Sequence, residues 1–435
     1  MAPGAAARIV FARMDDPDSH ALERYLATGG YEGLRAALAR PPAHVVEEVK
    51  TSGLTGRGGA GFPTGMKWGF LPPDVFPRYL VVNGDESEPG TFKDRQLMDR
   101  DPHQLVEGAL IAAYAIGADR VFCYVRGEMA LAQERLAQAI ADAYRIGAAG
   151  TDIFGSGFSV DVVAHWGAGA YIVGEETAML ESLEGRHAYP RIKPPYFPAT
   201  RGLYYQPTIV NNVETLSNLP WILRHGGTAF AALGGGRSTG TRIFCVSGHV
   251  NRPGNYEVEL VKTTFRDLIE SPDYGAGIRS GRQVKAFIPG GASAPWFFPE
   301  HLDLPLDPDE VAKAGSMLGS GAVVVMDDTT CPVRAAWNIV RFFAHESCGQ
   351  CTPCREGTWW QDKLLARIEH GQGRRQDIDL LWDVSDNISV GLGWPPRMTT
   401  ICPLGPSACS PVASSIRRFR DDYLTHVNEG GCPHA

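Results

Sequence analysis

Short apolar runs alternate with helical periodicity through the first half of the chain. The runs at 78–83, 120–125 and 160–165 predict buried strands. Apolar positions at helical spacing predict helices between and before them, at 103–117, 130–145 and 175–184, with shorter helices between residues 20 and 50. Strands that alternate with helices favour a parallel sheet covered by helices, so the first half is predicted to be α/β.

The pattern changes near residue 233. The glycine-rich stretch 234–240 predicts a linker, and the runs that follow it predict short strands at 241–248, 284–289 and 322–326. Helical periodicity returns after Cys331, with helices predicted at 333–345, 358–370, 378–388 and 411–426. We therefore expect an α/β domain with a helical lead at 1–235, a small β-rich domain at 236–330 and a helical bundle at 331–435.

Composition narrows the class of protein. The chain has 435 residues, 44% of them hydrophobic and 21% charged, which is ordinary for a globular protein. A net charge of −8 argues against a nucleic-acid partner, and no apolar run approaches the length needed to cross a bilayer. The start of the chain lacks the features of a secretory or transit peptide. We expect a cytoplasmic chain, or one docked on another protein that meets the membrane.

Three cysteines carry the most specific chemistry. Cys348, Cys351 and Cys354 follow the spacing C-x2-C-x2-C, and an iron–sulfur cubane needs four such thiolates. His345 makes zinc an alternative, but zinc ligands usually form two separated pairs, so we favour a [4Fe–4S] cluster that carries electrons. The fourth ligand stays open among the cysteines that precede a proline: Cys331, Cys402 and Cys432.

A glycine loop and an acidic segment are candidates for cofactor binding. The loop G56-R-G-G-A-G61 lacks the preceding strand of a dinucleotide fingerprint and the Gly-Lys-Ser/Thr of a phosphate loop. Its glycines still allow close approach to a phosphate or a flat ring, and Arg57 and Lys67 add positive charge. The segment N83-G-D-E-S-E-P-G90 follows the first predicted strand, where a parallel sheet places its ligands, and its carboxylates suit the hydroxyls of a ribose or ribityl chain.

Taken together, these motifs resemble the NADH-binding flavoprotein subunit of respiratory complex I, an NADH-quinone oxidoreductase. The resemblance runs from about residue 20 to about residue 430. Its motifs are G53-L-T-G-R-G-G-A-G-F-P-T-G-M-K-W68, N83-G-D-E-S-E-P-G-T-F-K-D-R95, G167-A-G-A-Y-I-V-G-E-E-T-A-M-L-E-S-L-E-G185, N211-N-V-E-T215, K313-A-G-S-M-L-G-S-G321 and E346-S-C-G-Q-C-T-P-C-R-E-G357.

The resemblance implies hydride transfer from NADH to FMN and one-electron transfer through a [4Fe–4S] cluster, with no catalytic side chain because the cofactors carry the chemistry. It implies a Rossmann-like FMN/NADH domain, a ubiquitin-like (β-grasp) domain and a cluster-bearing bundle. The implied FMN residues are Gly56, Arg57, Gly58, Lys67, Asn83, Asp85, Glu86, Ser87, Tyr171, Gly174, Glu175, Glu176, Asn211, Asn212 and Thr215. The implied NADH residues are Gly58, Gly59, Ala60, Phe62, Lys67, Phe70, Glu88, Tyr171, Glu176 and Lys193. The implied cluster ligands are Cys348, Cys351, Cys354 and Cys402.

The resemblance also implies partners and a location. They are a thioredoxin-like [2Fe–2S] subunit and a large multi-cluster iron–sulfur subunit, on the cytoplasmic side of the bacterial plasma membrane, with the membrane arm reached only through other subunits. The alternative function is the diaphorase subunit of a soluble NAD-linked hydrogenase or formate dehydrogenase. A zinc-stabilised binding scaffold is a third possibility. Either Tyr196 or Phe197 is expected to stack on the adenine.

Overall fold

The computed structural model describes residues 8–433. The first seven residues belong to the chain start that was expected to lack the features of a targeting peptide, and they lie outside the described residues. The chain forms two compact units, each described by itself. The first unit contains the chain up to Ser87, then Phe92–Phe244 and Glu257–Lys262; the second contains Glu88–Thr91, Cys245–Tyr256 and the chain from Thr263 onward. This division differs from the three expected domains, whose limits remain a prediction.

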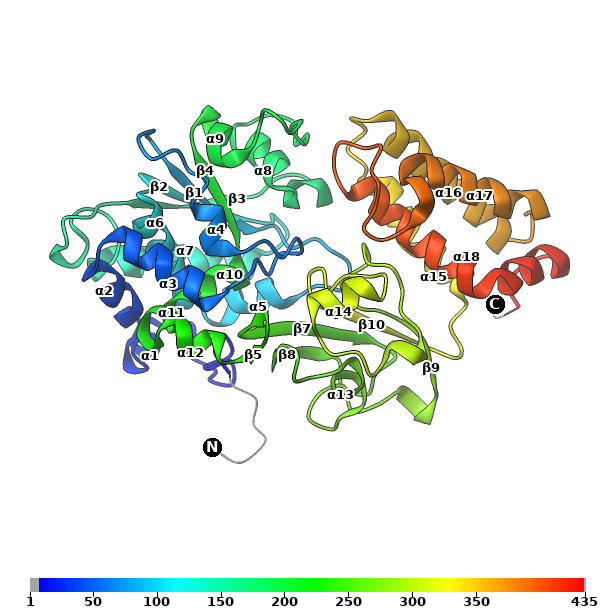
Figure 1. The fold of residues 1–435 in the computed structure, drawn as a ribbon, viewed down its shortest axis with the longest axis horizontal. Helices are drawn as coiled ribbons and strands as arrows, with labels where there is room; N and C mark the ends of the chain where they lie inside the picture. The colour runs from blue at the N-terminus through cyan, green and yellow to red at the C-terminus, as the bar shows by residue number, and fades with distance from the viewer. Residues whose placement is uncertain (1–7, 434–435) are drawn as a thin grey trace. The chain divides into compact units, whose positions relative to one another are not determined.

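The first unit is built on the parallel sheet whose strands are labelled β1 to β4 in Figure 1, and the strand order is β3-β2-β1-β4. Its strands are β1 (Tyr79–Gly84), β2 (Arg120–Val125), β3 (Asp161–Trp166) and β4 (Thr208–Asn212). The register pairs Val82 with Asn211 and Asn83 with Asn212, so β1 and β4 end side by side. The strand order reverses between β1 and β4, which is where open α/β sheets place their ligands.

Helices cover this sheet as the apolar periodicity predicts. The central helix α6 (Pro102–Ile116) is buried along almost its whole length and ends at Gly117 in the left-handed conformation, φ +62°. A Cβ at Gly108 would lie 2.1 Å from the Leu216 carbonyl oxygen, so only glycine permits this close approach of α6 to α10. The helices of this unit are α1 (Leu22–Ala27), α2 (Glu32–Leu38), α3 (Pro42–Ser52), α4 (Thr64–Trp68), α5 (Lys93–Arg100), α6, α7 (Ala130–Arg145), α8 (Glu176–Leu183), α9 (Pro198–Arg201), α10 (Val213–Ser217), α11 (Leu219–His225) and α12 (Gly227–Ala231).

The stretch predicted to be a linker is instead a small hairpin of β5 (Gly234–Gly235) and β6 (Ser238–Thr239). The buried Thr239 explains the difference, because its hydroxyl donates to the Ser52 carbonyl at 2.8 Å and its own carbonyl accepts from Arg57 at 3.1 Å. Polar side chains that bond to neighbouring backbone give a glycine-rich segment a fixed conformation.

A second sheet has the strand order β8-β7-β10-β9. Its strands are β7 (Thr241–Gly248), β8 (Gly254–Glu259), β9 (Val284–Ile288) and β10 (Ala322–Asp327), and the accompanying helices are α13 (Phe265–Glu270) and α14 (Pro308–Lys313). Strand β10 runs parallel to β7 and antiparallel to β9. The rings of Phe265, Phe287 and Phe297 pack with centroids 5.1–6.0 Å apart, and this aromatic core accounts for the predicted small β-rich domain.

The C-terminal part of the second unit is the expected helical bundle. It consists of α15 (Pro332–Glu346), α16 (Thr352–Glu369), α17 (Arg375–Ile388) and α18 (Leu404–Glu429) around a core that includes Val340, Leu364 and Ile416. Helix α18 begins at Leu404 and continues through Pro411, which was predicted to be its start. In the part of the chain that the structure describes, no helix is both long and apolar enough to cross a membrane.

Candidate functional site

Polar groups gather at the carboxyl ends of β1 and β4. The Asn83 side chain donates to the Gly174 carbonyl at 2.9 Å and accepts from the Asp85 N–H at 3.1 Å, while the Ser87 hydroxyl donates to the Asp85 carboxylate at 2.6 Å. On the neighbouring strand, Asn211 accepts from the Trp68 indole at 3.0 Å. Residues that come from distant parts of the sequence, and that were predicted to bind one ligand, therefore lie at one edge of the sheet.

The glycine loop contacts the same edge. The Arg57 N–H donates to the Thr215 hydroxyl at 2.8 Å, and a Cβ at Gly58 would lie 3.1 Å from the Asn212 Cβ. Gly59 has φ +135° and Gly61 has φ +66°, conformations that favour glycine. The loop thus brings bare backbone close to the end of β4, where a flat ring or a phosphate can approach it.

The Arg57 side chain has a structural role in this arrangement. Its guanidinium is buried and donates to the carbonyls of Thr239 and Thr241, at 3.1 and 3.0 Å, so it is occupied by backbone. Burial, with Arg242 nearby, lowers the pKa of Arg57 to about 10, which leaves the group charged at neutral pH. Lys67 is therefore the better candidate for direct electrostatic contact with a ligand.

Lys67 and Lys193 form ion pairs with the two carboxylate oxygens of Glu176. The Lys67 ammonium lies 2.9 Å from one carboxylate oxygen of Glu176, and the Lys193 ammonium lies 2.8 Å from the other. Burial favours the neutral acid, but Lys67 and Lys193 outweigh it and lower the pKa of Glu176 to about 2. Glu175 caps α8 by accepting from the N–H groups of Thr177 and Ala178. The ion pairs therefore hold Lys67, Lys193 and Glu176 in place without any added ligand.

A buried charge network that the sequence motifs did not predict lies beneath these residues. Lys93 bridges Asp94 at 2.9 Å and Glu214 at 2.7 Å, and Asp94 accepts from the Asn212 amide at 2.6 Å. Glu86 accepts from the first N–H groups of α5, and burial together with Asp94 raises the pKa of Glu86 to about 7. The signals for it in the sequence were the run F92-K-D-R95 in the second motif and Glu214 in the motif N211-N-V-E-T215. The network fixes Asn212 and Glu86 rather than leaving them mobile.

Two aromatic side chains stand exposed beside the glycine loop. Phe62 and Phe70 are 43% and 55% exposed, with ring centroids 5.7 Å apart. Large exposed rings at a loop of glycines are suited to stacking on a planar ligand. Tyr171 and Gly174 belong to the 3-10 turn Tyr171–Gly174, which ends at the polar edge of the sheet.

Glu88, an expected NADH residue, belongs to the second unit. Its carboxylate accepts from the Ser293 N–H at 2.7 Å, and a Cβ at Gly291 would lie 2.7 Å from the Glu88 Cγ. Gly291 has φ +95°, so glycine is needed there both for the backbone and for the space that Glu88 fills. The 291–293 loop therefore sets the position of this carboxylate.

The cysteine triplet lies at the start of a long helix. Cys351 is the N-cap of α16 and Cys354 lies in its first turn. Burial, with the nearby Cys351 and Cys348 thiols, raises the pKa of Cys354 to about 11. The positive end of an 18-residue helix favours an anionic ligand set, as thiolates around an iron–sulfur cluster require.

Cys402 lies just before the start of α18. Two glycines show that the N-terminal ends of α16 and α18 pack at the same place. A Cβ at Gly357 in α16 would lie 2.5 Å from the Ile388 side chain, and one at Gly405 in α18 would lie 2.8 Å from it. Both helices therefore pack closely on Ile388 at their N-terminal ends. Cys354 and Cys402 each precede these glycines by three residues, so both cysteines lie at the same end of the bundle.

Cys331 and Cys432, the other cysteines that precede a proline, lie at the opposite end of the bundle. Cys331 and Cys432 group with Glu369, the last residue of α16, which is about 22 Å along the helix from Cys354. Cys409 is buried, donates to the Ser385 carbonyl and accepts from the Gln361 amide, as an ordinary core thiol does. Of the cysteines that precede a proline, only Cys402 lies at the same end of the bundle as the triplet.

Comparison with known families agrees with this geometry. Residues 49–221 match the Nuo51 FMN-binding domain, residues 243–272 match the SLBB domain, and residues 334–426 match the NADH-ubiquinone oxidoreductase-F iron-sulfur binding region. The chain is thus an FMN-binding, iron–sulfur oxidoreductase, and the predicted cofactors, FMN and a [4Fe–4S] cluster, are confirmed at the level of these domains. The loop of glycines and the four thiols fit the two groups.

Individual relatives define the family more closely. The chain is 51% identical to the F subunit of NADH-quinone oxidoreductase of Mycobacterium tuberculosis strain H37Rv, over 98% of this chain and 94% of the relative. It is 49% identical to the protein of the same name in Streptomyces coelicolor, over 98% and 92%. The chain belongs to the family of NADH-quinone oxidoreductase F subunits, as the sequence motifs predicted.

Among solved structures, a chain of an NAD+-reducing [NiFe]-hydrogenase in the H2-reduced state is similar to this chain. The TM-score is 0.80 and the identity is 34%, with coverage of 99% of this chain and 68% of that one.

Proposed function

We propose that the chain is the NADH-oxidising subunit of a complex I-type NADH-quinone oxidoreductase. The observation that supports this most directly is the glycine loop at the ends of β1 and β4, beside the Lys67–Glu176 ion pair. When bound, FMN supplies two-electron hydride chemistry with NADH, and the iron–sulfur cluster supplies one-electron transfer. The side chains bind, orient and tune these groups.

The FMN site that we propose combines the glycine loop, the sheet edge and the α8 start. Bare backbone at Gly58 and Gly59 admits the ring, and Asn83, Asp85 and Ser87 offer hydrogen-bonding groups for a ribityl chain. Lys67 is held by Glu176 where its charge would stabilise an anionic reduced ring. The full proposed set is Gly56, Arg57, Gly58, Lys67, Asn83, Asp85, Glu86, Ser87, Tyr171, Gly174, Glu175, Glu176, Asn211, Asn212 and Thr215.

The NADH site that we propose uses exposed aromatic rings and acidic side chains. Phe62 and Phe70 would stack on the adenine, and Glu88 would accept hydrogen bonds from the adenosine ribose. The full proposed set is Gly58, Gly59, Ala60, Phe62, Lys67, Phe70, Glu88, Tyr171, Glu176 and Lys193. No general acid or base is required, because the bound cofactors would supply the hydride chemistry.

The cluster ligands that we propose are Cys348, Cys351, Cys354 and Cys402. The shared packing of Gly357 and Gly405 on Ile388 supports Cys402 as the fourth ligand. Electrons would leave through this cluster to a thioredoxin-like [2Fe–2S] subunit and a large multi-cluster iron–sulfur subunit. We place the assembly on the cytoplasmic side of the bacterial plasma membrane, with the membrane arm reached only through those partners. A net charge of −8 supports protein partners over nucleic acid.

A diaphorase subunit of a soluble NAD-linked hydrogenase or formate dehydrogenase is the second candidate function. The similarity to a chain of NAD+-reducing [NiFe]-hydrogenase supports it. It is the weaker candidate, because identity is 34% there and 51% to the quinone-linked relative. The proteins that co-purify with the chain distinguish the two functions: membrane proteins favour the first and a hydrogenase or formate dehydrogenase subunit the second.

The decisive experiment uses the purified, cofactor-loaded chain. We expect it to reduce ferricyanide with NADH but to reduce a soluble quinone only negligibly, since the proposed cluster would pass its electrons to partner subunits. Membranes that contain the whole assembly are expected to reduce quinone with NADH. Rapid quinone reduction by the isolated chain would overturn the proposal that it acts as a relay subunit.

A further inference from the structure

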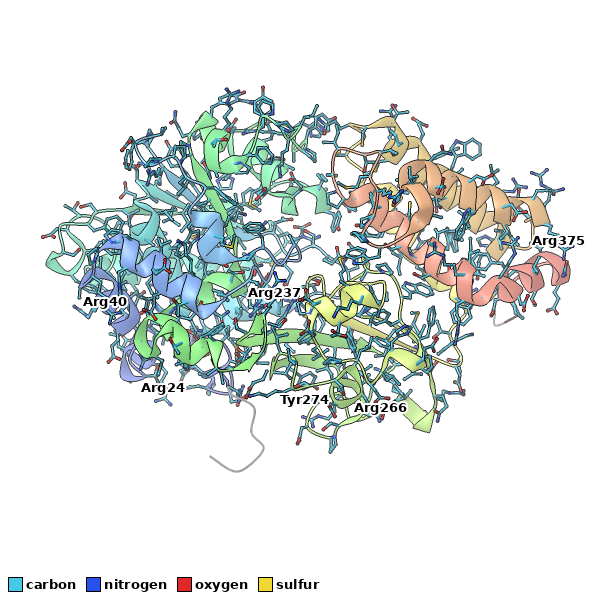
Figure 2. All side chains as sticks on the ribbon, viewed as in Figure 1. Arg24, Arg40, Arg237, Arg266, Tyr274 and Arg375 are labelled. Carbon is cyan, nitrogen blue, oxygen red and sulfur yellow. The ribbon has the colours of Figure 1, made fainter. Side chains whose placement is uncertain are left out.

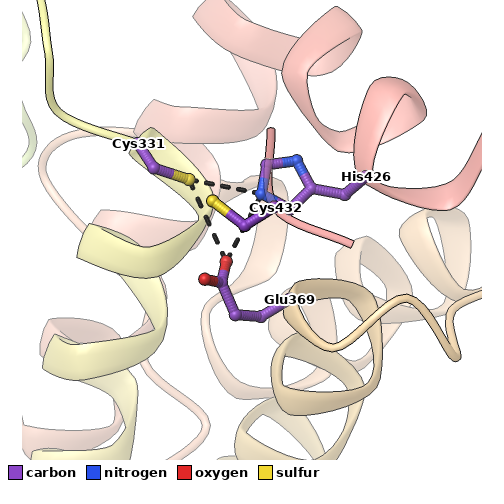
Figure 3. Close-up of side chains that lie close together, drawn as sticks. All are labelled: Cys331, Glu369, His426 and Cys432. Atoms are coloured by element: carbon purple, nitrogen blue, oxygen red, sulfur yellow. Dashed lines mark hydrogen bonds and ion pairs between the residues drawn. The ribbon is translucent and has the colours of Figure 1, made fainter. Parts of the chain in front are cut away.

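Four potential metal ligands converge at the end of the helical bundle opposite the cysteine triplet. They are Cys331, Glu369, His426 and Cys432, and one ligand atom from each lies within 4.8 Å of the others (Figure 3). Cys331 is the N-cap of α15, Glu369 ends α16, His426 lies in the last turn of α18, and Cys432 follows that helix. Neither the family matches nor the proposed function assigns these residues a role. We propose that they form a structural zinc site.

The distances fit a tetrahedral ion. Ordinary Zn–S, Zn–N and Zn–O bonds at tetrahedral angles place neighbouring ligand atoms about 3.4–3.8 Å apart. The Cys331 Sγ lies 3.3 Å from the His426 Nε2 and 3.9 Å from a Glu369 carboxylate oxygen, and that oxygen lies 3.4 Å from the same nitrogen. Three separate elements therefore hold their ligand atoms at zinc spacing.

The surroundings orient the ligands. The His426 Nδ1 lies 2.6 Å from the Asp422 carbonyl, which can only accept, so Nδ1 carries the hydrogen and the Nε2 lone pair faces Cys331 and Glu369. Arg334 donates to one Glu369 oxygen at 2.6 Å and leaves the other to face the group. The backbone N–H of Arg334 also donates to the Cys331 sulfur at 3.4 Å. Such outer hydrogen bonds accompany metal ligands and fix their direction.

Charge also favours a divalent cation. Two thiolates and a carboxylate carry three negative charges, which a divalent cation and the Arg334 guanidinium neutralise. His426 and Glu369 are almost wholly buried, and their facing nitrogen and oxygen are both acceptors unless a proton or a metal lies between them. Two sulfurs with one imidazole are borderline-soft ligands that suit zinc, and four protein ligands leave no open position for catalysis.

The site is distinct from the iron–sulfur site. Glu369 and Cys354 lie about 22 Å apart along α16, at opposite ends of the helix. A cubane takes each thiolate on a different iron, whereas the four atoms here converge on one point. A bound zinc would join the start of α15 to the ends of α16 and α18, and so hold the chain beyond α18 against the bundle.

The test measures metal content in the iron-loaded, full-length protein. After a chelator wash we expect about one tightly held zinc per chain beside a full complement of iron. Zinc K-edge absorption is expected to show two sulfur and two nitrogen or oxygen neighbours. Less than roughly a tenth of a zinc per chain, with the iron complete, would overturn the proposal, as would a Cys331–Cys432 disulfide found in the protein isolated anaerobically.

Variants assign the ligands. Cys331→Ser and Glu369→Gln are expected to lower zinc retention at least about tenfold while iron stays bound, and Cys348→Ser is expected to do the reverse. Cys123→Ala, a change at a buried thiol in β2, is the matched control and is expected to keep both metals. Zinc that survives Cys331→Ser or that disappears with Cys348→Ser contradicts this site. Failure of the NADH assay would leave these metal counts unaffected, so the two proposals fail separately.

Discussion

The Lys67 ammonium donates to the Glu176 carboxylate and to the Val210 carbonyl, each at 2.9 Å. Val210 belongs to β4 and Glu176 opens α8, so one cation joins the sheet to the helix start at the predicted flavin site. Such a charge needs no reorganisation when a ligand gains negative charge. Its position therefore predicts an effect on the redox chemistry of that ligand. Figure 2 draws the side chains of the described residues as sticks on the ribbon.

Lys67→Met is expected to lower the midpoint potential of the bound flavin by a few tens of millivolts, since about 30 mV corresponds to 1.4 kcal/mol for a two-electron couple. The reason is the loss of a fixed positive charge that favours the reduced, anionic ring. A spectroscopic redox titration of the purified variant measures it. Lys50→Met, on an exposed part of α3, is the control and is expected to leave the potential unchanged. Equal potentials in the Lys67 variant and the unmodified protein would contradict the proposed position of the flavin.

Glu88→Gln is expected to raise the use of NADPH more than it lowers the use of NADH. A 2′-phosphate beside the Glu88 carboxylate would meet a like charge that costs several kcal/mol when it is out of water, whereas an amide removes the repulsion. The ratio of kcat/KM for the two nucleotides is the measurement. An unchanged ratio counts against Glu88 as the residue that selects NADH.

Gly291→Ala provides an independent test of the same carboxylate. A Cβ there would lie 2.7 Å from the Glu88 Cγ on a backbone with φ +95°, so the substitution displaces Glu88 without removing its charge. We expect a higher KM for NADH with little change in iron content. If KM stays the same, then the position of Glu88 does not determine nucleotide binding.

The sequence predicted most of the fold because the strands and long helices have clear periodicity. Strands β1, β2 and β3 and helices α6 and α7 lie within a few residues of their predicted positions. Strand β4 was missed, since only Ile209 and Val210 are apolar in it and its remaining residues are polar. Its partner β1 makes it a strand, and pairing between segments distant in sequence is not visible in local periodicity.

The candidate sites divide in the same way. Local motifs predicted the glycine loop and the cysteine triplet, and the family matches agree with both cofactors. The network of Lys93, Asp94 and Glu214 was not predicted, because its members come from segments more than a hundred residues apart. The convergence of Cys331 with His426 was also missed, because these two residues lie 95 positions apart in the sequence. Only the packing of helices brings such groups together.

Cys402→Ser is expected to remove most of the iron, whereas Cys409→Ser is expected to retain it. Cys402 lies at the start of α18 near the triplet, while the Cys409 thiol already bonds to the Ser385 carbonyl and the Gln361 amide. Iron and acid-labile sulfide analysis of the two variants measures the difference. A complete cluster in Cys402→Ser would assign the fourth ligand to another cysteine.

His103, inside α6, is expected to make the first unit sensitive to mild acid. Its ring lies against Tyr25 and Tyr31, and burial lowers the pKa of His103 to about 4; Arg13 and His20 add to the shift, while Asp142 and Glu23 oppose it. In the unfolded chain the pKa is about 6.5, so the unfolded state takes up a proton first as the pH falls. Stability is therefore lost between pH 6.5 and 4, by about 2 kcal/mol between pH 7 and pH 5.

Urea unfolding at both pH values measures this loss of stability. The variant His103→Gln should largely abolish the loss, and the exposed-site control His44→Gln should not. The same loss in all three proteins would mean that another group governs the acid sensitivity.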